Sequence, residues 1–438
     1  MANKKKQSNI FNDILNDEQY NSIEEMISSY KKDKSLELEV SFRKINYANY
    51  MRIIEYYIDQ VDEADISSVD SLDISIMLPD GNTYRISLFD KDQTEKFLEQ
   101  YANSKLTDIQ KYLLSLNPTD DIEIMFKDRG SADRLYIEDL EMVFKITNET
   151  PLTKTNQKPG LNGTEKMLYR YKQRATFKLN DNIKLDITLV RESNNIWNLA
   201  TKPANYEVEI EIMNSKINID TFFTEIESVL RIVQDSDVPI GRSEAKDVIQ
   251  LYQELLGLKH VTHLDSRNVV SIEAQHIVKF IPNRYAITDK ADGERYFMFS
   301  ITNGIYLIST NLVVKKTNLT IANEKYTNMI LDGELIINEY GRMFLAFDVV
   351  YAEGVDYRFD TKYTLTHRLG VLNSIIDRAF GTIIPFTDYA DKYKDIELQK
   401  IHEFYTKELK QYWKIFRTNL EKSKELFVTR KIYFLRWF

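Results

Sequence analysis

The chain contains no cysteine, and histidine, glycine and proline are scarce. Without cysteine there can be no disulfide, no thiolate zinc site and no cysteine nucleophile. The 13 glycines and 8 prolines are too few for a collagen-like, linker-like or low-complexity chain. The first of the five histidines is His260, so a metal ion in the first half would need carboxylate, carbonyl or water ligands. Such ligands favour Mg²⁺ or Mn²⁺ over zinc.

Long apolar runs and an excess of positive charge are also missing. No apolar run approaches the roughly 18 residues of a membrane span, and residues 1–7 lack the apolar core of a signal peptide. We therefore expect no membrane partner. The formal net charge is −9, so contact with nucleic acid would require a local basic site. A hydrophobic content of 43%, with 27 tyrosines and 22 phenylalanines, excludes general disorder.

The first half of the sequence has the pattern of a β protein. Amphipathic spacing predicts one or two short helices over residues 9–32, and alternation with a period of two then predicts a series of strands. The strands are expected at 36–43, 72–78, 83–89, 122–127, 135–145, 168–178, 183–191 and 206–213. A hairpin turn is expected at 79–82 and an exposed loop at 149–165. Many strands at short spacing favour an antiparallel barrel or sandwich.

The remaining elements suggest how the chain is divided. We expect a first domain at residues 1–225, a helical connector at 226–258 and a second domain at 259–438. The helical pattern over 218–258 is interrupted near Pro239 and Gly241. In the second domain we expect strands near 284–289, 295–301, 304–308, 330–338 and 343–350, and helices at 365–378 and 395–422. The expected fold class is α+β.

Charged side chains in the first domain are sorted by strand. Alternation puts acidic residues on one face of each of two strands and three cations on one face of a third. The acidic rows are Glu37 and Glu39, then Glu207, Glu209 and Glu211; the basic row is Arg170, Lys172 and Arg174, with Arg85, Asp186 and Thr188 on other strands. A solvated sheet face is the plain alternative for any one strand. Rows of like charge, however, need counter-charges, and the lumen of a closed eight-stranded barrel could hold both a cation and a polyphosphate.

These residues resemble the triphosphate tunnel metalloenzymes, and more narrowly the metal-dependent RNA 5′-triphosphatases of fungal and large-DNA-virus mRNA capping enzymes. The resemblance covers about residues 30–215 and implies an eight-stranded antiparallel barrel with flanking helices. It implies a divalent metal, Mg²⁺ or Mn²⁺, and leaves open which two of the three late glutamates bind it. The implied metal site comprises Glu37, Glu39, Glu207, Glu209 and Glu211, and the implied triphosphate site comprises Arg85, Arg170, Lys172 and Arg174. Glu37, Glu39 and Asp186 are the implied catalytic residues, and Asp186 would orient a basic residue or the attacking water.

A second group of motifs lies between residues 290 and 350. The segment Lys290-Ala-Asp-Gly-Glu-Arg295 lies between two apolar segments and could, taken alone, be a charged hairpin turn. A strand interrupted by an acidic turn at Asp332-Gly333-Glu334 follows, and then an apolar strand that contains Phe347 and one aspartate. In this order and spacing the three segments resemble motifs I, III and IIIa of the covalent nucleotidyltransferases, which include the mRNA guanylyltransferases and the ATP-dependent ligases.

This second resemblance implies nucleotidyl transfer through a lysine. A deprotonated lysine amine can attack the α-phosphate of a nucleoside triphosphate and expel pyrophosphate. Lys290 would be the nucleophile in the nucleotide site, where Arg295 would also contact the nucleotide. Glu334 would contact the ribose of the nucleotide or a metal ion, and Phe347 would stack on the base. Asp292 and Asp332 are expected to shape turns. No motif IV or V follows in order, so we expect an incomplete nucleotidyltransferase domain of antiparallel sheets and helices, and a chain that cannot complete the transfer alone.

Taken together, the two resemblances predict an mRNA-capping enzyme, because large-DNA-virus capping enzymes have this domain order. It would remove the RNA γ-phosphate and transfer GMP through a lysyl-GMP intermediate, with 5′-triphosphate RNA and GTP as substrates. A downstream capping fragment or a methyltransferase would be further partners, and a cytoplasmic viral factory or the virion the location. Two alternatives stay open: a ligase-like enzyme that uses ATP, and a non-catalytic subunit that binds triphosphate RNA. Nucleotide choice and phosphate release from RNA distinguish them.

Overall fold

The computed structural model of the chain contains two compact units, Met1–Asp235 and Ser236–Phe438. It describes residues 10–33, 35–152, 158, 160–161, 165–267, 286–287, 292–338, 341–379, 428–429 and 433–437. Within these ranges, no helix combines the length and the apolar character that crossing a membrane requires.

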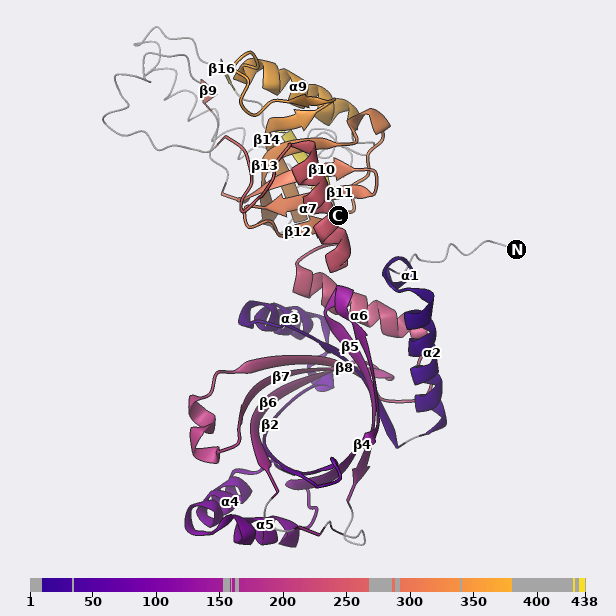
Figure 1. The fold of residues 1–438 in the computed structure, drawn as a ribbon, viewed down its shortest axis with the longest axis vertical. Helices are drawn as coiled ribbons and strands as arrows, with labels where there is room; N and C mark the ends of the chain where they lie inside the picture. Colours follow the sequence, from indigo (N-terminus) through magenta and orange to yellow (C-terminus); the bar gives the residue numbers. More distant parts are fainter. Residues whose placement is uncertain are drawn as a thin grey trace, which may run out of the picture. The chain divides into compact units, whose positions relative to one another are not determined.

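The first unit is built around a closed antiparallel barrel in the order β1-β5-β4-β3-β2-β6-β7-β8, which Figure 1 shows nearly end-on. Its strands are β1 (Leu36–Phe42), β2 (Ile66–Met77), β3 (Thr83–Leu88), β4 (Ile122–Ile137), β5 (Met142–Pro151), β6 (Met167–Asn180), β7 (Ile183–Ser193) and β8 (Asn205–Ile212). The expected turn between β2 and β3 is confirmed, and Gly81 supplies its positive φ of 89°. Because β1 pairs with both β5 and β8, the barrel has no unpaired edge.

The barrel strands turn their apolar faces outward and their polar faces into the lumen. Leu38 and Val40 of β1, for example, are fully buried in a core outside the barrel. One group of helices covers this core and a second group covers the opposite wall (Figure 1). The first group is α1 (Phe11–Ile14), α2 (Asp17–Lys32), α3 (Tyr47–Gln60) and α6 (Ile219–Gln234); the second is α4 (Lys91–Asn103) and α5 (Leu106–Ser115). The lumen is therefore the place left for the charged faces.

Local sequence explains where two of these helices begin. Asn16 and Gln19 exchange hydrogen bonds across the start of α2, and Asn46 and Asn49 do the same at α3. Asn49 also donates to the carbonyl of Val233 at 2.8 Å, which ties α3 to the end of α6. These caps fix the helices against the outer wall of the barrel.

Two expected boundaries differ from the structure. The expected strand at 135–145 spans the end of β4, the 3-10 helix η2 (Glu138–Leu140) and the start of β5, because Glu141 adopts a left-handed conformation that ends the extended run. The residues expected to form a connector, 226–258, are divided between the units. Helix α6 packs on the barrel, whereas α7 (Arg242–Leu255) buries Val248 and Tyr252 in the second unit.

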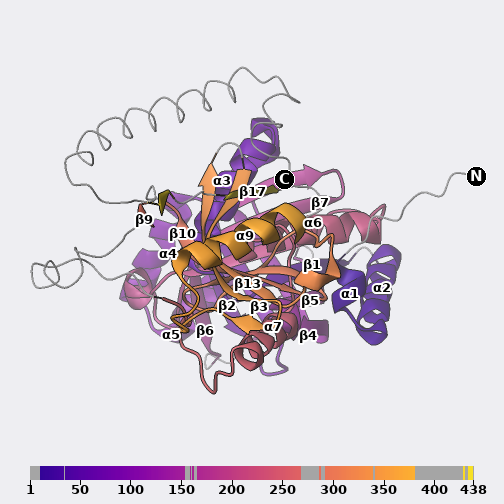
Figure 2. The same ribbon diagram turned by 90° about the horizontal axis from the view of Figure 1, so that it is seen from above.

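The second unit contains a seven-stranded sheet with the order β12-β11-β10-β13-β14-β15, and β17 also pairs with β14. The strands are β10 (Glu294–Ile301), β11 (Gly304–Ser309), β12 (Val314–Lys316), β13 (Met329–Asn338), β14 (Gly341–Ala352), β15 (Val355–Asp356) and β17 (Tyr433–Trp437). A separate pair joins β9 (Ala286–Ile287) and β16 (Val428–Thr429). Helix α9 (Leu365–Ala379) lies across one face of the sheet (Figure 2), and α7 packs in the core of the other face. The expected helix at 395–422 lies outside the described residues.

Glycine is required at one position of β13 for packing. A Cβ at Gly333 would lie 2.4 Å from the ring of Phe344 on β14 and 2.7 Å from the carbonyl oxygen of Leu345. This contact is far closer than van der Waals distance, so any side chain must displace either the ring or the strand backbone.

We expect Gly333→Ala to destabilise the second unit by about 1–3 kcal/mol, because the added methyl overpacks the sheet. Gly370→Ala is the matched control. Gly370 lies in α9 with open space around it, so alanine there should stabilise the chain by up to about 1 kcal/mol. Chemical denaturation of both variants measures the two effects, and a neutral Gly333→Ala would contradict the packing argument.

Candidate functional site

Four glutamates of β1 and β8 lie close together in the lumen. Glu39 is directly opposite Glu211, and Ser41 is opposite Glu209. Glu207 lies beyond the end of this pairing, opposite Thr188 on β7, and accepts a hydrogen bond from Arg170 at 2.5 Å. The structure therefore brings Glu37, Glu39, Glu209 and Glu211 together and places Glu207 apart from them.

Two lysines neutralise part of this acidic cluster. Lys145 of β5 donates to Glu39 at 2.8 Å, to the Ser41 hydroxyl at 2.6 Å and to Glu209 at 3.3 Å. Lys184 of β7 lies 2.8 Å from Glu211. These contacts bind three of the four carboxylates, and none of the ion pairs among the described residues includes Glu37.

The pKa values of the glutamates reflect this uneven pairing. Burial, together with the neighbouring carboxylates of Glu149, Glu211 and Glu39, raises the pKa of Glu37 to about 9. Burial likewise raises the pKa of Glu39, with Glu209 adding to the effect. Burial also opposes ionisation of Glu209, but Lys145 and the Ser41 hydroxyl outweigh it and lower that pKa. The cluster thus lacks positive charge at Glu37.

The four glutamates of the cluster have the kind of ligand atoms that a hard divalent cation prefers. All four side chains offer oxygen ligands, and the raised pKa of Glu37 marks the position where a positive charge is missing. In the part of the chain that the structure describes, no three acidic or histidine side chains converge on one ion. Glu39, Glu209 and Glu211 instead turn to Lys145 and Lys184.

The three cations of β6 also face the lumen, which confirms the expected register. Arg174 donates to Asp186 at 3.1 Å and to the Thr188 hydroxyl at 3.2 Å. Lys172 lies 2.5 Å from Asp73 of β2. Burial lowers the pKa of Lys172, and Arg170 and Arg85 lower it further, although Asp73 opposes the change. Positive charge is therefore concentrated on this side of the lumen.

Two arginines in this wall each have one N–H donor that makes no hydrogen bond to a described residue. The Nε atoms of Arg85 and Arg170 are buried and have no hydrogen-bond partner among the described residues. Arg85 uses another nitrogen to reach Glu149 at 3.4 Å, and Lys127 contacts the same carboxylate. An unsatisfied buried donor costs free energy, so this geometry favours a ligand that brings acceptor oxygens into the lumen.

Sequence reasoning missed several charged residues of the lumen. They are Asp73, Lys127, Lys145, Glu149 and Lys184. The alternation of residues 142–149 contains a signal for two of them, because Lys145 and Glu149 share the inward face of β5. Asp186 was expected to orient a basic residue or water, and it accepts from Arg174 and, at 2.5 Å, from Thr176.

The second unit brings three predicted nucleotide-site residues together. Arg295 of β10 is directly opposite Glu334 of β13, and its guanidinium lies 6.0 Å from the centre of the Phe347 ring. Its nitrogens donate to both oxygens of Asp332, at 2.9 and 2.6 Å, and to the Ser266 hydroxyl at 2.5 Å. The Oε2 atom of Glu334 is buried and has no partner among the described residues. Lys290 lies outside the described residues.

The expectation that an acidic turn interrupts the strand at Asp332 is wrong. Asp332 and Gly333 lie inside β13, and the pairing with β14 continues past them with a register shift at this step. Gly333 allows the close approach of Phe344, and the buried Asp332 binds Arg295. The polar and glycine residues here serve packing and charge pairing rather than a change of chain direction.

Comparison with known proteins shows extensive likeness to capping enzymes. The family "mRNA capping enzyme, catalytic domain" matches residues 233–426. The chain is 46% identical over 436 residues to a probable mRNA-capping enzyme of Acanthamoeba polyphaga mimivirus, and the match covers 99% of this chain and 37% of that protein. It is 44% identical to the crystal structure of the RNA triphosphatase domain of a trifunctional mimivirus mRNA capping enzyme, with a TM-score of 0.49, covering 50% of this chain and 98% of that domain. The chain thus spans little more than a third of the length of the curated relative.

The raised pKa of Glu37 predicts how stability depends on pH. The ordinary pKa of 4.5 is raised to about 9 in the folded chain, so between these values the folded state retains a proton that the unfolded state has lost. Stability is therefore lost as pH rises through this window. Glu37→Gln removes the effect.

In the presence of a chelator, we expect Glu37→Gln to be more stable than the parent chain near pH 8 and to differ little near pH 4. Denaturant unfolding at both pH values measures the difference. Glu55→Gln, at an exposed position of α3, is the control and should show no such pH dependence. Equal stability of Glu37→Gln and the parent near pH 8 would contradict the assignment.

Proposed function

Because this chain belongs to the mRNA-capping enzymes, we propose that its two units carry out the first two steps of cap formation. The barrel removes the γ-phosphate from 5′-triphosphate RNA with a divalent metal ion. The second unit supplies Lys290 for the transfer of GMP from GTP to the resulting diphosphate end, a step that we expect it to complete only together with a further capping fragment. A viral factory or the virion as location, and a downstream capping fragment or methyltransferase as partner, belong to the same proposal.

One observation supports the triphosphatase assignment above the others. The same barrel contains a carboxylate cluster that lacks positive charge at Glu37 and two buried arginine nitrogens that make no hydrogen bond to a described residue. A divalent metal satisfies the first deficit and a triphosphate satisfies the second. Bound together, they would cancel much of each other's charge in a site shielded from water, where electrostatic interactions are strong.

The acidic cluster would hold the metal ion. Glu37 and Glu39 of β1 with Glu209 and Glu211 of β8 are the proposed ligands, whereas Glu207 serves to hold Arg170. When bound, the metal would neutralise phosphate charge and make a coordinated water more acidic. Lys145 and Lys184, now paired with these carboxylates, would keep part of the cluster ionised.

The basic wall would hold the triphosphate. Arg85, Arg170 and Arg174 offer planar forks that suit phosphate oxygens, and Lys172 adds a compact charge. Asp186 fixes the guanidinium of Arg174 through the contact at 3.1 Å. Since the arginines are already held in place by carboxylates, little ordering is required when the substrate arrives.

We expect Glu39→Gln and Glu209→Gln to lose Mn²⁺ binding in calorimetric titrations of the chain. Phosphate release from triphosphate-ended RNA should fall by about 100-fold or more, because a ligand of the catalytic cation is removed. Glu207→Gln is the matched control and should keep its metal affinity, because it lies beyond the acidic cluster. Hydrolysis that survives an excess of chelator, or Glu207→Gln behaving like Glu209→Gln, would reject this assignment.

The second unit presents the residues expected to bind a nucleotide. Arg295 and Glu334 are directly opposite, with Phe347 close to the guanidinium. The unpaired Oε2 of Glu334 is suited to accept a hydrogen bond from a ribose hydroxyl. In the proposed step the Lys290 amine, having lost a proton, forms a bond to the α-phosphorus as the bond to the β-phosphate oxygen breaks and pyrophosphate leaves.

Replacing Glu334 should weaken binding of GTP by roughly tenfold, because one hydrogen bond to a charged acceptor is lost. Binding of GTP to Glu334→Ala, followed by fluorescence or calorimetry, measures this loss. Glu324→Ala, at an exposed position outside the sheet, is the control. Unchanged affinity in Glu334→Ala would contradict its role, and tighter binding of ATP than of GTP would favour the ligase-like alternative.

A further inference from the structure

The strand register shows which strand ends gather at each mouth of the barrel. Phe42 at the end of β1 is opposite both Met142, at the start of β5, and Val208, near the start of β8. Ile137 at the end of β4 is also opposite Met142, and Val190 of β7 is opposite Asn205 of β8. The segments 43–47, 136–142 and 193–206 therefore surround the same opening. We call it the Trp197 mouth.

Three exposed aromatic side chains lie on the segments of this mouth. Tyr47 is 60% exposed, Tyr136 is 46% exposed and Trp197 is 58% exposed. Tyr47 lies 5.9 Å from the ring of Tyr206, and the guanidinium of Arg43 lies 5.7 Å from the Tyr136 ring. Each of these rings is supported by a neighbour yet leaves much of its own surface open to solvent.

Trp197 is held in this exposed position by a well-anchored loop. Trp197 belongs to the 3-10 helix η3 (Ile196–Thr201), and its backbone N–H donates a hydrogen bond to the Asn195 side chain at 2.9 Å. Arg191 donates to the carbonyls of Ala200 at 3.2 Å and Lys202 at 2.7 Å, which fixes the far end of the loop. Its ring lies 5.8 Å from that of Tyr101 on α4. A large ring that is oriented but not buried is ready to stack on a partner.

The loop lies beside Arg170, a lumen cation with one nitrogen that makes no hydrogen bond to a described residue. η3 packs against β6 and β7. On these strands Tyr169 is opposite Ser193, and Arg170 is opposite Glu192, with the Arg170 Nε 3.5 Å from that carboxylate. The same Nε has no hydrogen-bond partner among the described residues. An RNA strand whose 5′ phosphates lie near Arg170 would therefore pass close to Trp197 where it leaves the barrel.

The other mouth is different in its described residues. The end of β3 lies there, and Phe89 just beyond it is 39% exposed. Among the exposed large hydrophobic residues, Phe89 is the one aromatic side chain next to a described strand end at this second mouth. Ion pairs such as Lys178 with Asp181 surround the β6–β7 turn instead. Stacking surfaces are thus concentrated at the Trp197 mouth.

We propose that triphosphate RNA enters the barrel through the Trp197 mouth, and that a base near its 5′ end stacks on Trp197. Tyr47 and Tyr136 extend the same aromatic rim. This inference rests on the proposed triphosphatase function. It adds a reason why the barrel would act on triphosphate-ended RNA in preference to a free nucleotide. Stacking on aromatic side chains suits single-stranded RNA of any sequence, because every base has a π face. A free nucleoside triphosphate offers one base, which is attached to the phosphates inside the lumen.

The test compares kcat/KM for a short triphosphate-ended RNA with kcat/KM for free ATP, using the 438-residue chain. The ratio of the two values should fall by roughly 5- to 100-fold in Trp197→Ala, as for the loss of one stacked base. Trp197→Phe should restore most of the ratio. Phe89→Ala, at the opposite mouth, is the matched control and should leave the ratio unchanged.

Three results would overturn the inference: an unchanged ratio in Trp197→Ala, an equal or larger fall in Phe89→Ala, or no rescue by Trp197→Phe. Loss of activity on both substrates in equal proportion also leaves the ratio unchanged and counts against it. Failure of the triphosphatase assignment is distinguishable, because the parent chain would then release no phosphate from either substrate.

Discussion

The pairing of β1 with β8 is the constraint on which the rest of the first unit depends. This pairing closes the barrel, and it also places Glu39 opposite Glu211 and Ser41 opposite Glu209. Carboxylates directly opposite one another on neighbouring strands repel, so closure by itself is unfavourable at this point. The lysines of the adjacent strands, Lys145 on β5 and Lys184 on β7, offset the repulsion from both sides. The deficit of positive charge that remains at Glu37 distinguishes the lumen from a self-neutralised polar core, and the proposed metal site rests on it.

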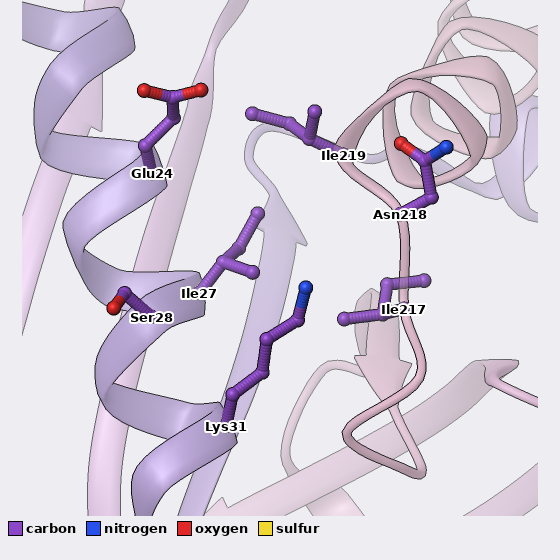
Figure 3. A pocket seen from close by; sticks show the side chains of 7 residues that line it. All are labelled: Glu24, Ile27, Ser28, Lys31, Ile217, Asn218 and Ile219. Atoms are coloured by element: carbon purple, nitrogen blue, oxygen red, sulfur yellow. The ribbon is translucent and has the colours of Figure 1, made fainter.

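Closure also explains why the helices lie outside. A barrel that turns its charged faces inward must bury its apolar faces against other elements, and the helices of the first unit provide that cover on both walls. The groove of about 520 Å³ between α2 and the start of α6, lined by Ile27, Lys31 and Ile219 among others, is a surface feature of this cover (Figure 3). It is separate from the lumen, where the charged residues converge. The stability of the unit thus resides in the outer cores, and the lumen is free to carry charges that a packed interior would not tolerate.

Sequence alone could predict the faces of the strands but not the contacts across them. Alternation with a period of two is enough to put Glu37, Glu39 and the β6 cations on inward faces, because the side-chain direction in a strand is fixed by position. It could not separate Glu207 from Glu209 and Glu211, since that difference depends on where the neighbouring strand β1 ends. It missed Lys127 and Lys184 because no local pattern reports which strand lies beside which. The boundary between β4 and β5 was misplaced because a left-handed residue, Glu141, ends one run of alternation and begins the next.

In the second unit, too, sequence alone could not predict the contacts of one motif across neighbouring strands. Asp-Gly-Glu at 332–334 suggests a turn by composition, yet all three residues lie within β13. The reason for glycine is the ring of Phe344, which occupies the space of a side chain, and the reason for aspartate is Arg295, which it neutralises through two hydrogen bonds. Because Asp332 already satisfies the guanidinium, Glu334 on the facing position is left with a buried oxygen that lacks a partner. A buried carboxylate oxygen without a hydrogen bond is costly in free energy, and a hydroxyl group of a bound ligand would remove that cost by donating to it. The pairing of Asp332 with Arg295 therefore leaves Glu334 with the acceptor oxygen on which its proposed role in nucleotide binding rests.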